Sequence, residues 1–111
     1  MNIEDIYFKL VESGQKTHEY RLNDEKRQAI RINDIIELIN NSDNNLKVEV
    51  KVIDVKVYPS WELALEKTYK QDFAGLYSSL KETINACSKF YDEEKIRKYG
   101  IVVFKIKKTS K

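Results

Sequence analysis

Residues 48–57 constrain the fold of this 111-residue chain more than any other segment. Apolar residues alternate there with charged ones, which predicts a strand with one buried face. The alternation changes phase at the adjacent pair Val52 and Ile53, because the apolar positions are even-numbered up to Val52 and odd-numbered from Ile53 onward. A β-bulge at this pair would exchange the buried face. A strand that bends in this way is typical of a sheet that curls into a barrel.

The N-terminal half of the sequence contains four further predicted elements. Apolar residues on one helical face predict a helix over residues 3–12, and turn chemistry precedes a helical turn over residues 24–29. Residues 34–39 are predicted to form a strand. Four of its residues are expected to be largely buried: Ile35, Ile36, Leu38 and Ile39. The polar residues 40–45 predict a hairpin loop that joins this strand to the long one.

The C-terminal half is predicted to be mostly helical before a last strand. Ser60 is a predicted N-cap of a short helix, and a second helix is expected over residues 72–91, with Gly75 as a candidate break near its start. Its apolar stripe consists of Phe73, Leu76, Tyr77, Leu80, Ile84, Cys87 and Tyr91. A further short helix over residues 92–98 precedes a central strand over residues 101–106, which is apolar on both faces. Residues 107–111 are expected to form a mobile tail.

The segment from Gly14 to Arg21 has the pattern G-x-K-x-x-E-x-R, which predicts a turn followed by a short strand. On a strand, Glu19 and Arg21 share one face while Tyr20 points to the other. Lys16 lies at the bend, within reach of either face. Two cations and a carboxylate are therefore expected to converge on a few ångströms of backbone.

This cluster has two interpretations. It could be a structural group of salt bridges that fixes the strand against the rest of the sheet. Alternatively it could form a polar pocket, in which Lys16 and Arg21 contact phosphate and Glu19 accepts hydrogen bonds from a base edge or orients Arg21. Aromatic side chains could add stacking surfaces for bases. The candidates nearest in sequence are Tyr20, Tyr58 and Trp61.

Several kinds of site are not indicated by the sequence. His18 is the single histidine and Cys87 the single cysteine, so neither a catalytic triad nor a zinc cluster is predicted. Cys87 is expected to be a buried apolar residue rather than a nucleophile. With three glycines in all, there is no Gly-rich phosphate loop. We expect neither a cofactor nor a metal ion.

Length and residue usage favour a single domain over residues 1–111. No apolar run reaches the roughly 18 residues that a membrane span needs, so no membrane partner is expected. The acidic start of the sequence lacks a signal-peptide layout, and one cysteine suits a reducing compartment. We therefore expect a cytoplasmic protein.

Charge is unevenly distributed along the chain. Residues 1–88 carry 12 Lys or Arg and 15 Asp or Glu, whereas residues 89–111 carry 8 and 3. A basic C-terminal end on a nearly neutral body is compatible with phosphate contact, although a solubilising tail would have the same composition.

The pattern of residues 14–21 resembles the signature of the ASCH domain, a branch of the PUA-like β-barrel superfamily. Other segments resemble the family in order: residues 31–36 (a strand entry), 48–57 (a long strand), 58–63 (a helix start) and 99–103 (a closing strand). Asn33 stands where the family commonly has glycine, and asparagine also tolerates the left-handed conformation.

This resemblance implies an α+β fold, a small PUA-like β-barrel of about five or six strands with helices packed over one side. It also implies binding of RNA or a nucleotide in a cleft formed by Lys16, Glu19, Arg21 and Tyr20. The sequence does not predict the oligomeric state.

The resemblance leaves an enzymatic alternative open, a small RNA-directed hydrolase that uses the same cleft. One ASCH-like branch hydrolyses N4-acetylcytidine with a lysine and a threonine of this motif. Lys16 matches that lysine, but Glu19 occupies the threonine position and a carboxylate cannot replace the hydroxyl nucleophile. Other members are ribonucleases, and in that case Lys16 and Glu19 would be the candidate catalytic pair.

Overall fold

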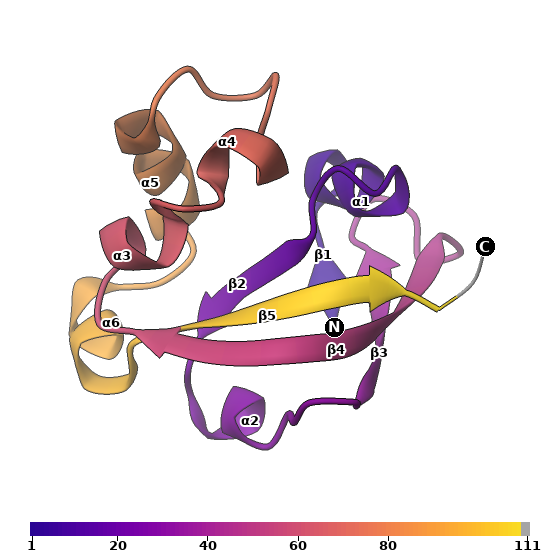
Figure 1. Cartoon of the computed structure of the whole chain (residues 1–111), viewed down its shortest axis with the longest axis horizontal. Coiled ribbons are helices and arrows are strands. Elements are labelled where there is room, and N and C mark those ends of the chain that lie inside the picture. Colours follow the sequence, from indigo (N-terminus) through magenta and orange to yellow (C-terminus); the bar gives the residue numbers. More distant parts are fainter. Residues whose placement is uncertain (110–111) are drawn as a thin grey trace.

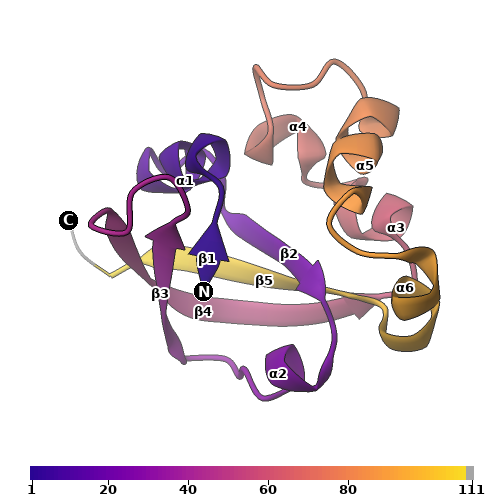
Figure 2. The ribbon, with the colours of Figure 1, turned by 180° about the vertical axis from the view of Figure 1, so that it is seen from behind.

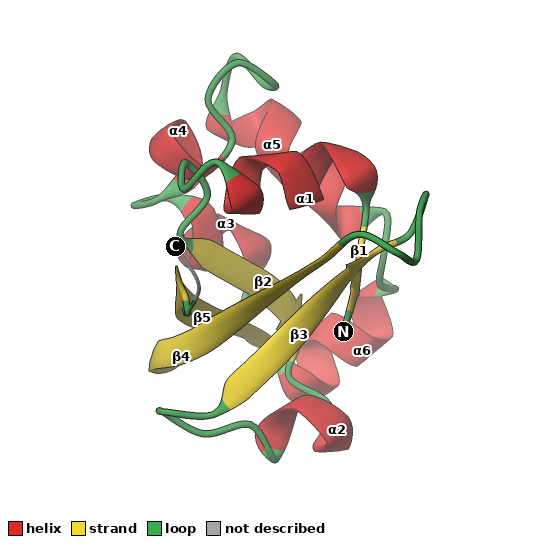
Figure 3. Ribbon diagram, turned by 90° about the vertical axis from the view of Figure 1, so that its right-hand side faces the viewer, coloured by secondary structure: helices red, strands yellow, loops and turns green. Residues whose placement is uncertain are grey.

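The computed structural model describes residues 1–109, which form one curled five-stranded sheet with six helices packed on it (Figures 1, 2 and 3). The strands are β1 (Asn2–Ile3), β2 (His18–Leu22), β3 (Ile35–Asn40), β4 (Lys47–Tyr58) and β5 (Ile101–Lys108). Their order in the sheet is β1-β3-β4-β5-β2, with β1 parallel to β3 and all other pairs antiparallel. The predicted α+β fold with a small barrel-like sheet is therefore confirmed, and the sheet curls into a half-barrel of five strands.

The helices are α1 (Asp5–Glu12), α2 (Glu25–Gln28), α3 (Trp61–Leu65), α4 (Tyr69–Asp72), α5 (Leu80–Ser88) and α6 (Glu93–Tyr99). Figure 1 shows α3, α4 and α5 grouped over one end of the sheet and α1 beside the N-terminal strand. Ser60 caps α3 as predicted, because its hydroxyl accepts a hydrogen bond from the Leu63 N–H. None of the helices in residues 1–109 is long and apolar enough to cross a membrane.

The long strand β4 contains the predicted bulge. Its register against β5 shifts between Val52 and Asp54, and Ile53 at the shift is 39% exposed. Before the bulge the even positions are buried, with Val50 and Val52 at 0% exposure. After it the expected inward face is only partly realised, because Val55 is half-buried and Val57 is exposed.

The last strand β5 is central, as its apolar sequence predicts, and lies between β4 and β2 (Figure 1). Val102 and Phe104 face one apolar cluster, which includes Phe8, Leu38 and Val50. The alternate residues of β5 face a second cluster, which includes Trp61, Leu65 and Phe73. Burial of apolar side chains on both faces makes β5 the strand on which the two clusters meet.

One predicted helix is wrong. The apolar spacing of residues 72–91 predicts a single helix, but α4 ends at Asp72 and α5 begins at Leu80. Gly75 adopts φ +86° in the intervening turn, and the Ser79 hydroxyl caps α5 by accepting from the Glu82 N–H. These two local signals end and restart the helix despite a continuous apolar spacing.

Three smaller expectations also differ from the structure. Ile35 is 53% exposed rather than buried, because it lies on the outer face of β3 with Glu37. The first helix begins at Asp5, since Asn2–Ile3 pair with β3 as a strand. Of the predicted mobile tail, Lys107 and Lys108 belong to β5, and residues 110–111 lie outside the described residues.

Candidate functional site

The motif follows α1 directly, as its sequence predicts. Gly14 adopts φ +87°, and the Lys16 N–H then donates to the Leu10 carbonyl at the end of α1. Strand β2 begins at His18 and pairs along its whole length with β5. The motif side chains are therefore positioned by a helix end on one side and a central strand on the other.

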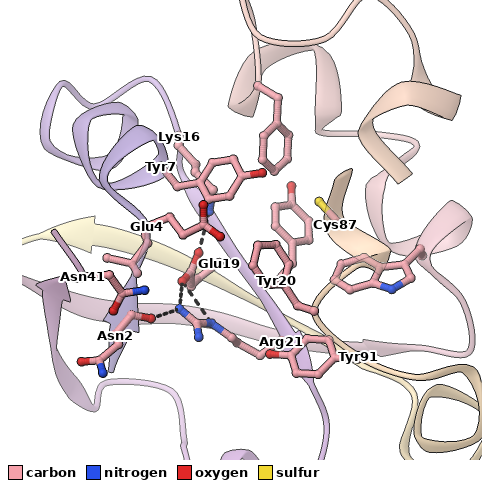
Figure 4. Close-up of a pocket in the computed structure, with 14 residues that line it drawn as sticks. Asn2, Glu4, Tyr7, Lys16, Glu19, Tyr20, Arg21, Asn41, Cys87 and Tyr91 are labelled. Carbon is pink, nitrogen blue, oxygen red and sulfur yellow. Dashed lines mark hydrogen bonds and ion pairs between the residues drawn. The ribbon is translucent and has the colours of Figure 1, made fainter. Parts of the chain in front are cut away.

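Lys16, Glu19 and Arg21 form one ion-paired cluster, which Figure 4 shows at the floor of a hollow. Lys16 Nζ donates to Glu19 Oε1 at 2.7 Å and also to the His18 carbonyl. Arg21 donates to Glu19 Oε2 from Nη2 at 2.6 Å and from Nε at 3.2 Å. Arg21 Nη2 also donates to the Asn2 carbonyl at 2.7 Å, which ties β2 to β1.

The cluster is largely withdrawn from solvent. The side chains of Lys16 and Glu19 are 2% and 8% exposed, and that of Arg21 is 16% exposed. Burial opposes ionisation of the Glu19 carboxyl group. The Lys16 ammonium and the Arg21 guanidinium outweigh this effect of burial, and the pKa of Glu19 is lowered to about 2. Glu19 is therefore a permanent carboxylate with one oxygen assigned to each cation.

The cluster lines a hollow that we call the aromatic pocket. Its cavity has a volume of about 130 Å³, which is below the roughly 300–1,000 Å³ that is typical of sites for drug-sized ligands. Its aromatic lining consists of Tyr7, Tyr20, Trp61, Phe73, Phe90 and Tyr91. Its polar lining adds Asn2, Glu4 and Asn41 to the motif residues. The arrangement offers flat apolar surfaces beside hydrogen-bond donors and acceptors.

Two of the three predicted stacking residues line this pocket. Tyr20 and Trp61 belong to it, whereas Tyr58 lines a different hollow. The Trp61 ring stacks on Tyr91 with centroids 6.3 Å apart, and Trp61 Nε1 is buried without a hydrogen-bond partner among residues 1–109. The buried Tyr20 ring forms part of the wall of the aromatic pocket, and Lys16 Nζ lies 5.2 Å from the ring centroid.

Tyr20 also links the motif to α4. Its hydroxyl donates to Asp72 Oδ2 at 2.5 Å, and burial together with the Asp72 carboxylate raises the Tyr20 pKa far above its usual range. Burial raises the pKa of Asp72, but hydrogen bonds from His18, Tyr20 and the Thr17 N–H outweigh it and hold that pKa below its usual value. A neutral phenol thus donates to a buried carboxylate.

Sequence reasoning missed most of the pocket walls. Asn2 and Glu4 come from the N-terminus, Asn41 follows β3, and Phe90 and Tyr91 connect α5 to α6. Phe90 is 51% exposed, which identifies it as a residue of the pocket mouth. No local pattern predicts these walls, because they are brought together by the parallel β1–β3 pair and by packing of α5.

Cys87 lines the aromatic pocket but is buried, as predicted. Burial raises the pKa of its thiol to about 12, so the reactive thiolate is not populated near neutral pH. Within residues 1–109, no group of three or more His, Cys, Asp or Glu side chains is placed to hold a metal ion.

The cations of the basic C-terminal end do not form one patch. Arg97 and Lys98 belong to α6, at the opposite end of β5 from Lys107 and Lys108 (Figure 1). Lys108 Nζ donates to the Glu12 carbonyl at the end of α1.

Comparisons with known proteins extend over nearly the whole chain. The family model for the ASCH domain matches residues 1–110. The crystal structure of the hypothetical protein PH0355 is 34% identical with a TM-score of 0.82, covering 97% of this chain and 95% of that one. The NMR structure of protein PF0455 from Pyrococcus furiosus is 30% identical with a TM-score of 0.73, covering 100% of both chains. No curated protein matches the sequence.

Proposed function

Because the chain belongs to the ASCH domain family, we propose that it binds RNA or a nucleotide and holds an unpaired base in the aromatic pocket. ASCH domains have a PUA-like fold that is often linked to RNA binding. The observation that carries the proposal is the position of the Lys16–Glu19–Arg21 cluster in a hollow with six aromatic side chains.

The pocket lining suits a base better than a phosphate. Bases of single-stranded RNA are recognised by stacking on aromatic rings and by hydrogen bonds to their edges. Phe90 and Tyr91 supply rings near the mouth, and Glu19 and Glu4 supply carboxylates that accept from base amino and imino groups. The Glu19 carboxylate is fixed in place by its two cations, so it needs little reorganisation to accept a further hydrogen bond.

Within this proposal the motif cations have different roles. Lys16 is buried, and its ion pair orients the Glu19 carboxylate. A direct contact with phosphate is therefore not the main role of Lys16. Arg21 uses Nε and Nη2 for Glu19 and Asn2, and the Tyr91 side chain is a further polar neighbour of its guanidinium. We assign to Arg21 the role of holding Glu19 and the pocket wall in place.

The electrostatics of the pocket favour binding over the hydrolase alternative. A general base is most effective when its pKa lies near the working pH. Glu19, with a pKa of about 2, is a weak base at neutral pH and is ionised, so it has no proton to donate. Glu19 is thus better suited to orienting a ligand than to transferring protons.

The proposal is tested by fluorescence anisotropy with short single-stranded RNA, comparing wild type with Phe90→Ala. Loss of one stacking surface should weaken binding about five- to hundredfold. Ile35→Ala is the matched control, since Ile35 has a similar exposed fraction (53% against 51%) and does not line the pocket. Equal affinities for the two variants would contradict the proposal. A gel of the same samples detects cleavage, which would instead favour the hydrolase.

A further inference from the structure

A second hollow lies over the face of β2 that carries His18, which is opposite to the face that carries Glu19 and Arg21, and it has a different chemistry. It has a volume of about 190 Å³ and contains four potentially cationic side chains: His18, Lys56, Lys67 and Lys105. We call it the basic groove. It lies over β2, β5 and β4, next to α3, and shares no lining residue with the aromatic pocket. Figure 1 shows these three strands side by side.

The strand register places these cations on one face. His18 pairs with Lys105 across β2 and β5, and Lys105 pairs with Asp54 across β5 and β4. In the next row of the same face, Val103 of β5 pairs with Lys56. Directly paired residues on neighbouring strands lie about 5 Å apart and point to the same side of a sheet. The cluster is therefore a consequence of the backbone and not of one side-chain conformation.

Most of the positive charge in the groove is not neutralised. No ion pair involves Lys67 or Lys105 in the part of the chain that the structure describes, and Lys56 Nζ is 3.9 Å from Asp54 Oδ2. In the aromatic pocket, by contrast, Lys16 and Arg21 are both paired with Glu19 at 2.7 Å or less. Three lysines beside one aspartate give the groove a net positive charge.

His18 is held in a fixed orientation at the edge of this groove. Its Nδ1 lies 3.2 Å from Asp72 Oδ2 and 3.0 Å from Thr17 Oγ1, and Asp72 is fully buried. Both neighbours accept hydrogen bonds, which assigns a proton to Nδ1. Nε2 then remains as the free ring nitrogen, and a protonated ring presents Nε2–H to an anion. Asp72 is itself fixed by the Thr17 N–H at 2.9 Å and by the Tyr20 hydroxyl.

Building on the proposed RNA binding, we propose that the basic groove binds the backbone phosphates of single-stranded RNA, with the ammonium groups of Lys56, Lys67 and Lys105 as the donors and His18 adding an Nε2–H donor in its imidazolium form. This is a second site, separate from the aromatic pocket. Strand β2 supplies both, because Glu19 and Arg21 line the pocket while His18 lines the groove. The groove would supply the salt-dependent part of RNA affinity and the pocket the base-dependent part.

The first test neutralises the groove by Lys56→Gln/Lys67→Gln/Lys105→Gln. The matched control, Lys51→Gln/Lys81→Gln/Lys95→Gln, removes the same charge from three exposed lysines that line neither hollow. We expect the groove variant to bind single-stranded RNA at least tenfold more weakly. Its plot of log affinity against log salt should be less steep by about 2, since each phosphate contact to a single strand contributes about 0.7. Equal losses in the two triple variants would overturn the proposal.

A second variant isolates the histidine. The side-chain amide of His18→Asn occupies the place of Nδ1 and keeps a hydrogen bond to Asp72, but has no atom in the place of Nε2. We expect weaker RNA binding with an unchanged melting temperature. Unchanged RNA affinity would remove His18 from the site.

A third measurement separates this proposal from the one for the aromatic pocket. An abasic oligonucleotide has phosphates but no bases, and a nucleoside has a base but no phosphate. In NMR titrations of the wild-type protein, the abasic strand should shift the amide signals of His18, Lys56 and Lys105. Absence of these shifts would overturn the proposal that the basic groove binds phosphates, regardless of the result of the nucleoside titration. Absence of nucleoside shifts at Phe90 and Tyr91 counts against the pocket alone.

Discussion

The Tyr20 hydroxyl donates to Asp72 Oδ2 at 2.5 Å, joining β2 to the end of α4 across 52 residues of sequence. Asp72 is fully buried and also accepts from the Thr17 N–H at 2.9 Å. The strand that carries the candidate binding residues is therefore attached to the helical layer through the buried Asp72 carboxylate and through a hydrogen bond between Tyr20 and Thr68.

Tyr20→Phe should test the strength of this attachment. It removes the hydrogen bonds of the Tyr20 hydroxyl to the Asp72 carboxylate and to Thr68 Oγ1, and we expect it to destabilise the fold by about 1–3 kcal/mol. Urea denaturation of wild type and variant measures the difference. An unchanged free energy of unfolding would mean that the Tyr20–Asp72 contact does not hold β2 against α4.

The buried ion pair of Lys16 and Glu19 predicts strong coupling between the two residues. Lys16→Met alone leaves a buried carboxylate with one cation fewer and should destabilise by about 3–5 kcal/mol. Adding Glu19→Gln should recover part of this loss, because the double variant no longer buries the unpaired carboxylate. A double-mutant cycle measures the coupling. Additive effects of the two substitutions would contradict this account.

Lowering the pH should reduce the free energy of unfolding, because Glu19 becomes protonated. Its pKa is lowered from 4.5 to about 2 in the folded protein, so the stabilisation is fully present above the unfolded value of 4.5 and is lost as the pH falls toward 2. The stability gap between wild type and Glu19→Gln should therefore shrink over this range. Urea midpoints measured across it provide the test, and a gap independent of pH would refute the linkage.

Gly100 ends α6 with φ +76°, and a Cβ there would lie 2.8 Å from the Tyr58 carbonyl oxygen. Gly100→Ala combines an unfavourable φ with a backbone collision and should destabilise by about 2–4 kcal/mol. Gly14→Ala is the matched control, because Gly14 has φ +87° but no atom within 4 Å of its Cβ position. It should cost about 1 kcal/mol. Thermal unfolding compares the two variants, and equal losses would exclude the collision as a cause.

Local rules predicted the features that depend on neighbours in sequence. The phase change at Val52 and Ile53 predicted the bulge in β4, and the period of two along a strand placed Glu19 with Arg21 and away from Tyr20. The helix predicted over residues 72–91 was too long because periodicity does not locate helix ends, although Gly75 was a candidate break and does lie in a turn before α5.

The pocket walls and the groove could not be predicted because they depend on contacts distant in sequence. The Arg21 contact to the Asn2 carbonyl requires the β1–β3 pair. The Nδ1 of His18 meets Asp72 only after α4 packs beside β2. A sequence pattern supplies these side chains but not their partners.

The most direct test of base binding is an NMR titration of the isotope-labelled protein with each of the four ribonucleosides. The account predicts intermolecular NOEs between base protons and the ring protons of Phe90 and Tyr91, with chemical-shift changes at Glu19. Phe90→Ala should reduce these changes while Ile35→Ala leaves them intact. Shifts confined to residues outside the aromatic pocket, or none with any nucleoside, would contradict the proposal that the pocket holds a base.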